Sequence, residues 1–219
     1  MSPRGVTCHV SRMYVPQAAI GSAAEAEIFI QHVRTATEVA LRDILTIEPD
    51  CLVHGFTGLS FMGGQAGYTR LKEQLETRAG VRVTTGAEAV IAALRVCGAG
   101  TIAIVTPQPE LMDEHYRQFF AESGMHVARL QHIHCPTALD IARVEEAALR
   151  RAMIDVNSDD IDAIVCVGAD LASAQLADEA ERWLDKPVIS MSTALLWYTL
   201  RTMQIADQVR GFGFLLRDQ

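Results

Sequence analysis

Two short stretches of the sequence share one pattern, and each places a side chain that can transfer a proton at the same point. "DCLVHGFTG" spans residues 50–58 and "DAIVCVGAD" spans residues 162–170; each has an acidic residue, an apolar run and a glycine-bearing turn. His54 lies in the first run, and Cys166 takes the matching place in the second. Imidazole and thiolate groups exchange protons near neutral pH. The pattern therefore suggests an acid/base pair with one member in each stretch.

Packing is the alternative explanation for both side chains. Free cysteine is among the most buried residue types, and a histidine inside an apolar run can be a core residue. In this interpretation His54 and Cys166 fill space and do no chemistry. The sequence leaves both interpretations open.

The elements that position these residues alternate regularly between strand and helix. Short β-branched, apolar runs are typical of strands, and apolar residues spaced three and four apart are typical of helices. The predicted strands are residues 6–15, 50–56, 81–85, 101–107, 126–133, 162–168 and 186–192, with a short edge strand within 211–216. The predicted helices are residues 22–45, 67–80, 87–98, 109–124, 137–155, 172–185 and 193–205. This alternation predicts an α/β fold with helices on both faces of a parallel sheet.

The repeated pattern divides this alternation into two units of like construction. Each unit has a strand, a glycine-bearing turn, a helix, a second strand and a second helix. We therefore predict two pseudo-symmetric halves, residues 1–85 with 190–219 and residues 86–189. The loops after the carboxyl ends of the strands would line a cleft between them, where open α/β sheets bind ligands.

Composition and charge argue against several classes of protein. The formal net charge of −8 disfavours nucleic acid as a partner, because phosphate binding needs a basic surface. No apolar run reaches the roughly 18 residues of a membrane span. The five cysteines are scattered without a CxxC pair, which favours a reduced, cytoplasmic protein. In "HIHC", His132 and His134 share one face of an extended segment, but spacing ties no third ligand to them, so we predict no metal site.

Four segments, in order along the chain, resemble a known family. They are "FTGLSFMGG", "VRVTTGAEAVIAALRVCGAGTIAIVTP", "DAIVCVG" and "EAERWLDKPVISMSTALLW". Together they are similar to the aspartate/glutamate racemase superfamily, in its branch of maleate cis–trans isomerases and arylmalonate decarboxylases. The resemblance implies two Rossmann-like (flavodoxin-like) halves, a small carboxylate substrate between them, no cofactor and a homo-oligomer. It also implies one catalytic thiol at the strand tip of each half.

This sequence departs from the family pattern at the positions of the catalytic residues. Phe56 and Gly168 occupy the two cysteine positions, and Gln108 replaces the tyrosine that usually follows the "VTP" strand. Phenyl and glycine groups transfer no protons, so His54 and Cys166, two residues earlier in each stretch, become the candidates for a relocated pair. The resemblance assigns substrate binding to residues at the turns: Phe56, Thr57, Gly58, Thr106, Gln108, Gly168, Ala169, Asp170 and Ser190.

Two further features bear on the resemblance. The segment 6–15 is similar to the branch's second strand, so the family's first strand and its "PSSN"-like loop are expected to be missing. Asp170 would cap the helix that follows, or would bind a cationic group. The second role suits ectoine, an amidine that a subgroup of this branch is associated with.

Three functions remain open on the sequence. The first is cofactor-independent isomerisation or racemisation of a small carboxylic acid. The second is decarboxylation of a substituted malonate, for which Phe56 would supply apolar contact. The third is a non-catalytic binder of small acids, which the loss of the family's thiols favours.

Overall fold

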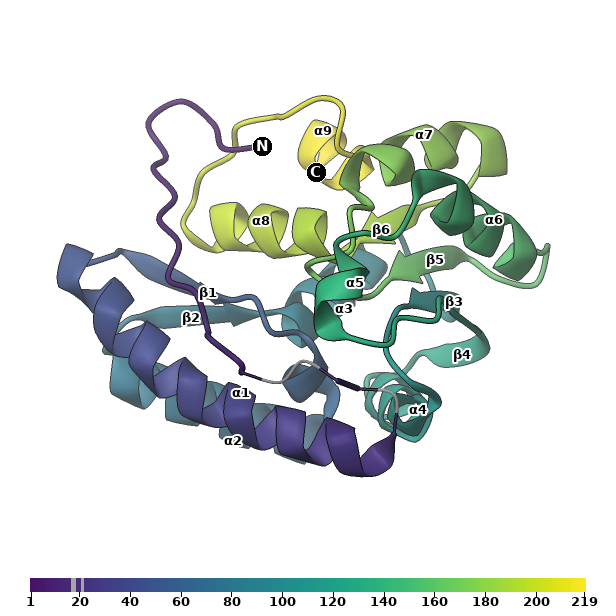
Figure 1. Cartoon of the computed structure of the whole chain (residues 1–219). Helices are drawn as coiled ribbons and strands as arrows, with labels where there is room; N and C mark the ends of the chain where they lie inside the picture. The colour runs from purple at the N-terminus through teal and green to yellow at the C-terminus, as the bar shows by residue number, and fades with distance from the viewer. Residues whose placement is uncertain (17–18, 21) are drawn as a thin grey trace.

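The structure, a computed structural model, describes residues 1–16, 19–20 and 22–219 and contains two parallel sheets (Figure 1). The smaller sheet pairs β1 (Cys51–His54) with β2 (Arg82–Thr85). The larger has the order β4-β3-β5-β6, formed by β4 (His126–His132), β3 (Thr101–Thr106), β5 (Ala163–Cys166) and β6 (Val188–Ser190). All strand pairs run parallel, which confirms the predicted α/β class.

Nine α-helices connect and cover these strands in the part of the chain that is described. They are α1 (Ala23–Ile44), α2 (Gly64–Ala79), α3 (Gly86–Val96), α4 (Asp113–Glu122), α5 (Ala138–Ile141), α6 (Glu146–Val156), α7 (Ala174–Leu184), α8 (Met191–Thr202) and α9 (Phe214–Asp218). Local signals set their ends. The Ser22 hydroxyl accepts a hydrogen bond from the Glu25 N–H at the start of α1, and Gly80, at φ +68°, ends α2. Within the described residues, no helix is long and apolar enough to cross a membrane.

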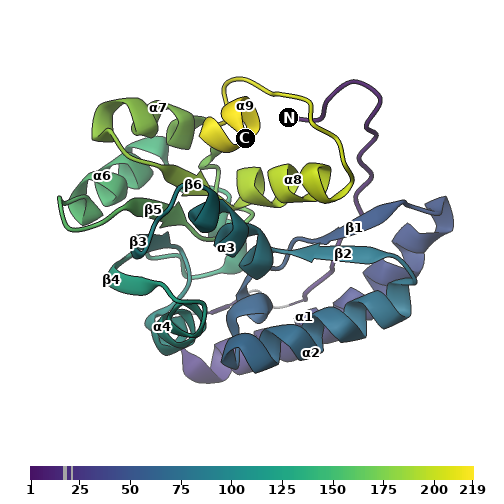
Figure 2. The ribbon, with the colours of Figure 1, turned by 180° about the vertical axis from the view of Figure 1, so that it is seen from behind.

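The helices form layers around the two sheets. α1 and α2 lie on one side of β1 and β2, and α8 lies on the other (Figure 1). Along β3 the side chains alternate between two cores: Ile102 and Ile104 face α3, α4 and α8, whereas Ala103 and Val105 face α6 and α7. Figure 2 shows α3 between the two sheets, below α8. Since α3 and α8 pack together and α8 also contacts β1, β2 and β6, this helix pair joins the two sheets.

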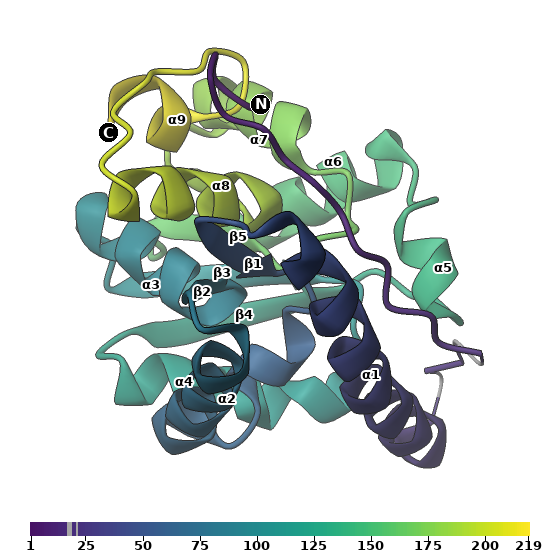
Figure 3. The same ribbon diagram turned by 90° about the vertical axis from the view of Figure 1, so that its left-hand side faces the viewer.

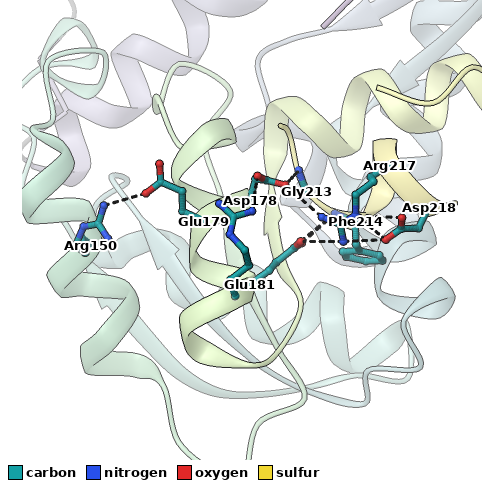
Figure 4. A network of polar contacts seen from close by, with 9 residues as sticks. Arg150, Asp178, Glu179, Glu181, Gly213, Phe214, Arg217 and Asp218 are labelled. Carbon is teal, nitrogen blue, oxygen red and sulfur yellow. Dashed lines mark hydrogen bonds and ion pairs between the residues drawn. The ribbon is translucent and has the colours of Figure 1, made fainter. Parts of the chain in front are cut away.

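Acidic side chains of α7 bind the C-terminal helix α9 through hydrogen bonds and ion pairs (Figure 4). The Gly213 N–H donates to Asp178 Oδ1 at 3.0 Å, and the Phe214 N–H donates to Glu181 Oε2, also at 3.0 Å. Arg217 pairs with Asp178 at 3.4 Å. Carboxylates suit the N-terminal end of a helix, where N–H groups lack partners within the helix. Leu215 and Leu216 of α9 are buried in the central core.

The prediction of a strand at residues 6–15 is wrong. These residues run as irregular chain along the outside of the molecule (Figure 3), and Val10 and Tyr14 are 80% and 81% exposed. A strand needs a hydrogen-bonding neighbour, and none of the described strands pairs with this stretch.

Two other element predictions need correction. The expected edge strand within 211–216 is instead a loop followed by α9, because Asp178 and Glu181 accept the N–H groups that begin that helix. The single helix expected at 137–155 is divided into α5 and α6. Acidic residues stand at both starts, Asp140 in the capping box of α5 and Glu146 in the first turn of α6, and negative charge favours a helix N-terminus.

Candidate functional site

The turns that follow β1, β3 and β5 meet at Pro107 and Gln108. A Cβ atom placed on Gly58, after β1, would lie 3.1 Å from Gln108 Nε2. A Cβ atom placed on Gly168, after β5, would lie 3.1 Å from Pro107 Cγ. Gly168 also has φ +114°, a conformation that L side chains rarely adopt. The structure therefore brings three predicted site residues, Gly58, Gln108 and Gly168, to one place.

A second contact joins this place to the two central helices. A Cβ atom on Gly86, the first residue of α3, would lie 2.7 Å from Thr57 Cγ2 and 2.8 Å from Met191 Sδ. Met191 begins α8 directly after Ser190, the last residue of β6. The buried turn at Thr57 and the starts of α3 and α8 are thus in contact, and a Cβ atom at position 86 would force Thr57 and Met191 to shift.

Hydroxyl groups line these helix starts. The Ala87 N–H donates to Ser60 Oγ at 3.2 Å, and the Ser60 hydroxyl donates to the Thr57 carbonyl at 2.6 Å. Ser190 Oγ lies 2.7 Å from Ser173 Oγ and 3.1 Å from Ser192 Oγ. Helix N-termini and hydroxyl donors together bind anions, and a carboxylate is one. The turns therefore gather main-chain and side-chain groups of the kind that binds carboxylates.

His54 is a buried, neutral imidazole at the tip of β1. Its side chain is 8% exposed, and neither ring nitrogen has a hydrogen-bond partner among the described residues. Burial lowers the pKa of His54 to about 4, because the charged form loses its hydration. At neutral pH the ring is uncharged and one nitrogen is free to accept a proton.

Cys166 lies at the matching tip of β5 in an apolar layer. It is fully buried with Val105, Leu171 and Leu176, in the core that α6 and α7 cover. Burial raises the pKa of the Cys166 thiol to about 12, so the nucleophilic thiolate is strongly disfavoured at neutral pH. Leu52, which shares a strand face with His54, packs in a different core, against α1 and α2. The structure gives no contact between His54 and Cys166, and the surroundings of Cys166 favour the packing interpretation.

Comparison with known proteins shows the family to which the chain belongs. Residues 32–216 match the family described as arylmalonate decarboxylase. This chain belongs to that family. It is 26% identical to a maleate isomerase of Pseudomonas putida over 98% of this chain and 85% of that protein. It is 28% identical to an arylmalonate decarboxylase of Bordetella bronchiseptica over 73% of this chain and 68% of that protein. A solved maleate cis–trans isomerase of Nocardia farcinica superposes with a TM-score of 0.83 at 20% identity, covering 92% and 82% of the two chains.

Against this family background, the residues at the expected thiol positions have apolar surroundings. Phe56 packs on Phe29 of α1, with ring centroids 5.6 Å apart. Ala169, beside Gly168, is half-buried and packs against the central core. Asp170 is exposed, and α7 begins at Ala174 with Ser173 as its cap residue, so the expected helix-capping role of Asp170 is wrong.

The sequence missed two side chains that contact Gln108. The hydroxyl of Tyr116, on α4, donates to Gln108 Oε1 at 2.5 Å, and His132 Nδ1 lies 2.9 Å from the Gln108 carbonyl oxygen. Thr106 Oγ1 accepts from the Gln108 N–H at 3.1 Å. A signal was available for His132, since it ends a predicted strand and pairs in register with Thr106 on β3. The described residues hold no group of three side chains fit for a metal ion, so His132 and His134 form no such site there.

A hollow of about 430 Å³ runs beside β4 and reaches the end of that strand at His132. Asp113, Arg117, Arg129, His132 and Asp155 are among the residues that line it, along β4 and between α4 and α6. Arg117 donates to the Val127 carbonyl and Arg129 pairs with Asp160, so both cations are already engaged. Because the carboxylates of Glu110, Asp113 and Asp155 outnumber the two arginines in this lining, the hollow suits an acid less well than the three converging turns do.

Proposed function

We propose that this chain binds a small carboxylic acid at the strand tips and isomerises or racemises it without a cofactor. The observation that carries the proposal is the contact of three turns from both sheets around Gly58, Gln108 and Gly168. Relatives named maleate isomerase and arylmalonate decarboxylase support a small carboxylate as the ligand. The helix starts at Gly86 and Met191 and the hydroxyl of Ser190 would hold the carboxylate oxygens.

His54 is the side chain we assign to proton transfer. It ends β1 three residues before Thr57, and its neutral ring has a free lone pair. A general base accepts a proton only from a group within hydrogen-bond reach, so the assignment requires the substrate to approach the tip of β1. Cys166 is the weaker member of the predicted pair, because its thiol is enclosed and protonated.

The second candidate function is a non-catalytic binder of small acids. Phe56 and Gly168 stand where the resemblance places the family's thiols, and Cys166 is sequestered from those turns. Such a protein would keep the hydrogen-bond donors that hold a carboxylate but would lack the thiols that transfer protons. Decarboxylation ranks below both, because Phe56 supplies apolar contact but no proton for the product.

Proton nuclear magnetic resonance in deuterated water separates these functions. Maleate, an arylmalonate and ectoine are each incubated with the wild-type protein, and binding, double-bond geometry and deuterium uptake are followed. We expect turnover or exchange with one acid, about a hundredfold slower exchange in His54→Gln, since general-base catalysis contributes factors of that order, and retained exchange in Cys166→Ser. Binding without exchange would establish the binder, and full activity of His54→Gln would remove His54 from the mechanism.

The same samples test the remaining expectations. Ectoine binding would support the cationic ligand that Asp170 suggests, and loss of that binding in Asp170→Asn would assign it to the carboxylate. The predicted homo-oligomer is checked by light scattering at several protein concentrations.

A further inference from the structure

Gln108 is held at both its main-chain groups. Its N–H donates to Thr106 Oγ1 at 3.1 Å, and its carbonyl oxygen lies 2.9 Å from His132 Nδ1. A carbonyl oxygen only accepts hydrogen bonds, so Nδ1 of His132 carries the proton. The other ring nitrogen lies 3.1 Å from Asp113 Oδ1 at the start of α4. Neither of these two atoms has a hydrogen-bond partner among the described residues, so the contact that orients the Gln108 main chain is the bond from Nδ1.

The side chain of Gln108 is held as firmly, by a closed ring of hydrogen bonds. The fully buried Tyr116 hydroxyl lies 2.5 Å from Gln108 Oε1 and 3.4 Å from Thr106 Oγ1. An amide nitrogen accepts no hydrogen bond, so the donating Tyr116 hydroxyl pairs with the amide oxygen. The amide oxygen therefore faces Tyr116. The donors follow one direction around the ring, from the Gln108 N–H to Thr106, then to Tyr116, then to Gln108 Oε1, and such a ring strengthens each bond.

This orientation leaves the amide nitrogen of Gln108 free. Nε2 points at the Gly58 turn, 3.1 Å from where a Cβ of Gly58 would lie. None of the hydrogen bonds among the described residues uses this nitrogen. An amide NH₂ carries two protons to donate and no charge.

We propose that the Nε2 group of Gln108 donates a hydrogen bond to a carboxylate oxygen of the substrate, and that Tyr116 and His132 are positioning residues for this donor. The proposal rests on the proposed function, since it assumes that an acid binds at the strand tips. It assigns a function to a histidine that metal binding does not explain, and to a tyrosine that packs in the core. It also gives the site a preference for acceptor-only oxygens over ammonium groups.

Ligand affinity tests the donor. Isothermal titration of maleate is compared between the wild type, Gln108→Ala and Gln108→Glu. We expect an affinity loss of about tenfold in Gln108→Ala and of about a hundredfold or more in Gln108→Glu, because hydrogen bonds to a charged group are worth more than neutral ones and the new carboxylate repels the acid. Undiminished maleate binding by Gln108→Ala would overturn the donor assignment.

A double-mutant cycle tests the positioning residues. Tyr116→Phe should weaken maleate binding about fivefold, yet should cost nothing further in the Gln108→Ala background, since contacting residues are non-additive. Tyr68→Phe is the matched control: Tyr68 packs on Phe119, its hydroxyl bonds to Glu88 at 3.1 Å, and none of the hydrogen bonds among the described residues joins it to Gln108. Equal and additive losses from Tyr116→Phe in both backgrounds would overturn the positioning role.

A ligand-free measurement separates failure of the inference from failure of the proposed function. In the ¹H–¹⁵N spectrum of the free protein, Tyr116→Phe and His132→Asn should each shift the side-chain amide signals of Gln108, and Tyr68→Phe should not. These shifts could occur while the wild type binds none of the acids. Tyr116 and His132 would then position the Gln108 side chain, but the proposed function and the donor role of Gln108 would both be refuted. If the signals do not move, the positioning inference falls whatever the wild type binds.

Discussion

β1 and β5 arise from nearly the same sequence pattern but have different surroundings. β5 lies between β3 and β6, and all four of its residues are buried. Among the described strands β1 pairs only with β2, and its Val53 is 46% exposed, whereas Val165, at the matching place in β5, is fully buried. The repeat therefore specifies a strand, but the neighbours on both edges decide how deeply the strand is buried.

The surroundings of the two sheets also differ in how they treat a titratable side chain. In the smaller sheet, His54 is buried without a hydrogen-bond partner among the described residues. Beside the larger sheet, Glu181 is half-buried on α7, accepts a hydrogen bond from the Phe214 N–H and lies near Arg217. Each of these two side chains loses stability in its charged form, and the two losses in the free energy of unfolding depend on pH in opposite directions.

The largest expected effect comes from a charge placed at the matched valines. Val165→Asp puts a carboxylate without a partner into a closed core, and we expect a loss of about 4 kcal/mol or more in the free energy of unfolding. Val53→Asp should cost less than about 1 kcal/mol, because that side chain reaches solvent. Urea denaturation of both variants measures the difference. Similar losses would mean that the two strands are equally buried.

A smaller effect concerns His54 and acid. Its pKa in the folded protein, about 4, lies below the unfolded value of 6.5, so the unfolded chain binds the proton first. Stability is therefore complete above pH 6.5 and falls towards pH 4, by up to about 3 kcal/mol. His54→Gln should remove this slope, measured by denaturation at several pH values. The exposed His126 on β4 is the control, and an equal slope change in His126→Gln would contradict the assignment.

The smallest effect concerns Glu181 and has the opposite sign. Burial raises its pKa to about 7 from an ordinary 4.5, so the folded protein keeps the proton longer than the unfolded chain. Stability is complete below pH 4.5 and falls as pH rises through 7, by about 2 kcal/mol once partial solvent screening is allowed for. Glu181→Gln should flatten this slope in denaturation measurements. Glu179→Gln on the same helix, whose carboxylate pairs with Arg150 at the surface, should leave it unchanged.

The sequence predicts most of the fold, because most of its signals are local. The apolar runs at β1, β3 and β5 and the helix-ending Gly80 need no knowledge of distant residues. Residues 6–15 carry an equally good strand pattern and form none, since a strand also needs a neighbour. Residues 211–216 form a loop and a helix start because Asp178 and Glu181 of α7 accept their N–H groups. Those acceptors come near only in the folded chain.

The site divides in the same way. Gly58, Gln108 and Gly168 were predictable because each follows a strand and the strand ends of an α/β fold meet. The partners of Gln108 were not, since Tyr116 lies in the middle of a helix whose pattern predicts only packing. The sequence indicated that His132 is a polar residue near the end of a strand. Its contact with the Gln108 carbonyl depends on the folded path of residues 106–108.

The central core that α3 and α8 share has a consequence for biosynthesis. It contains Phe61, early in the chain, and Leu215 and Leu216, almost at its end. A nascent chain leaving the ribosome can pair β1 with β2 soon after both emerge, but the core above them stays open until α8 and α9 have been translated. Contacts so distant in sequence close slowly. Co-translational chaperones would therefore meet an exposed apolar surface on this protein until residues 191–218 have been translated.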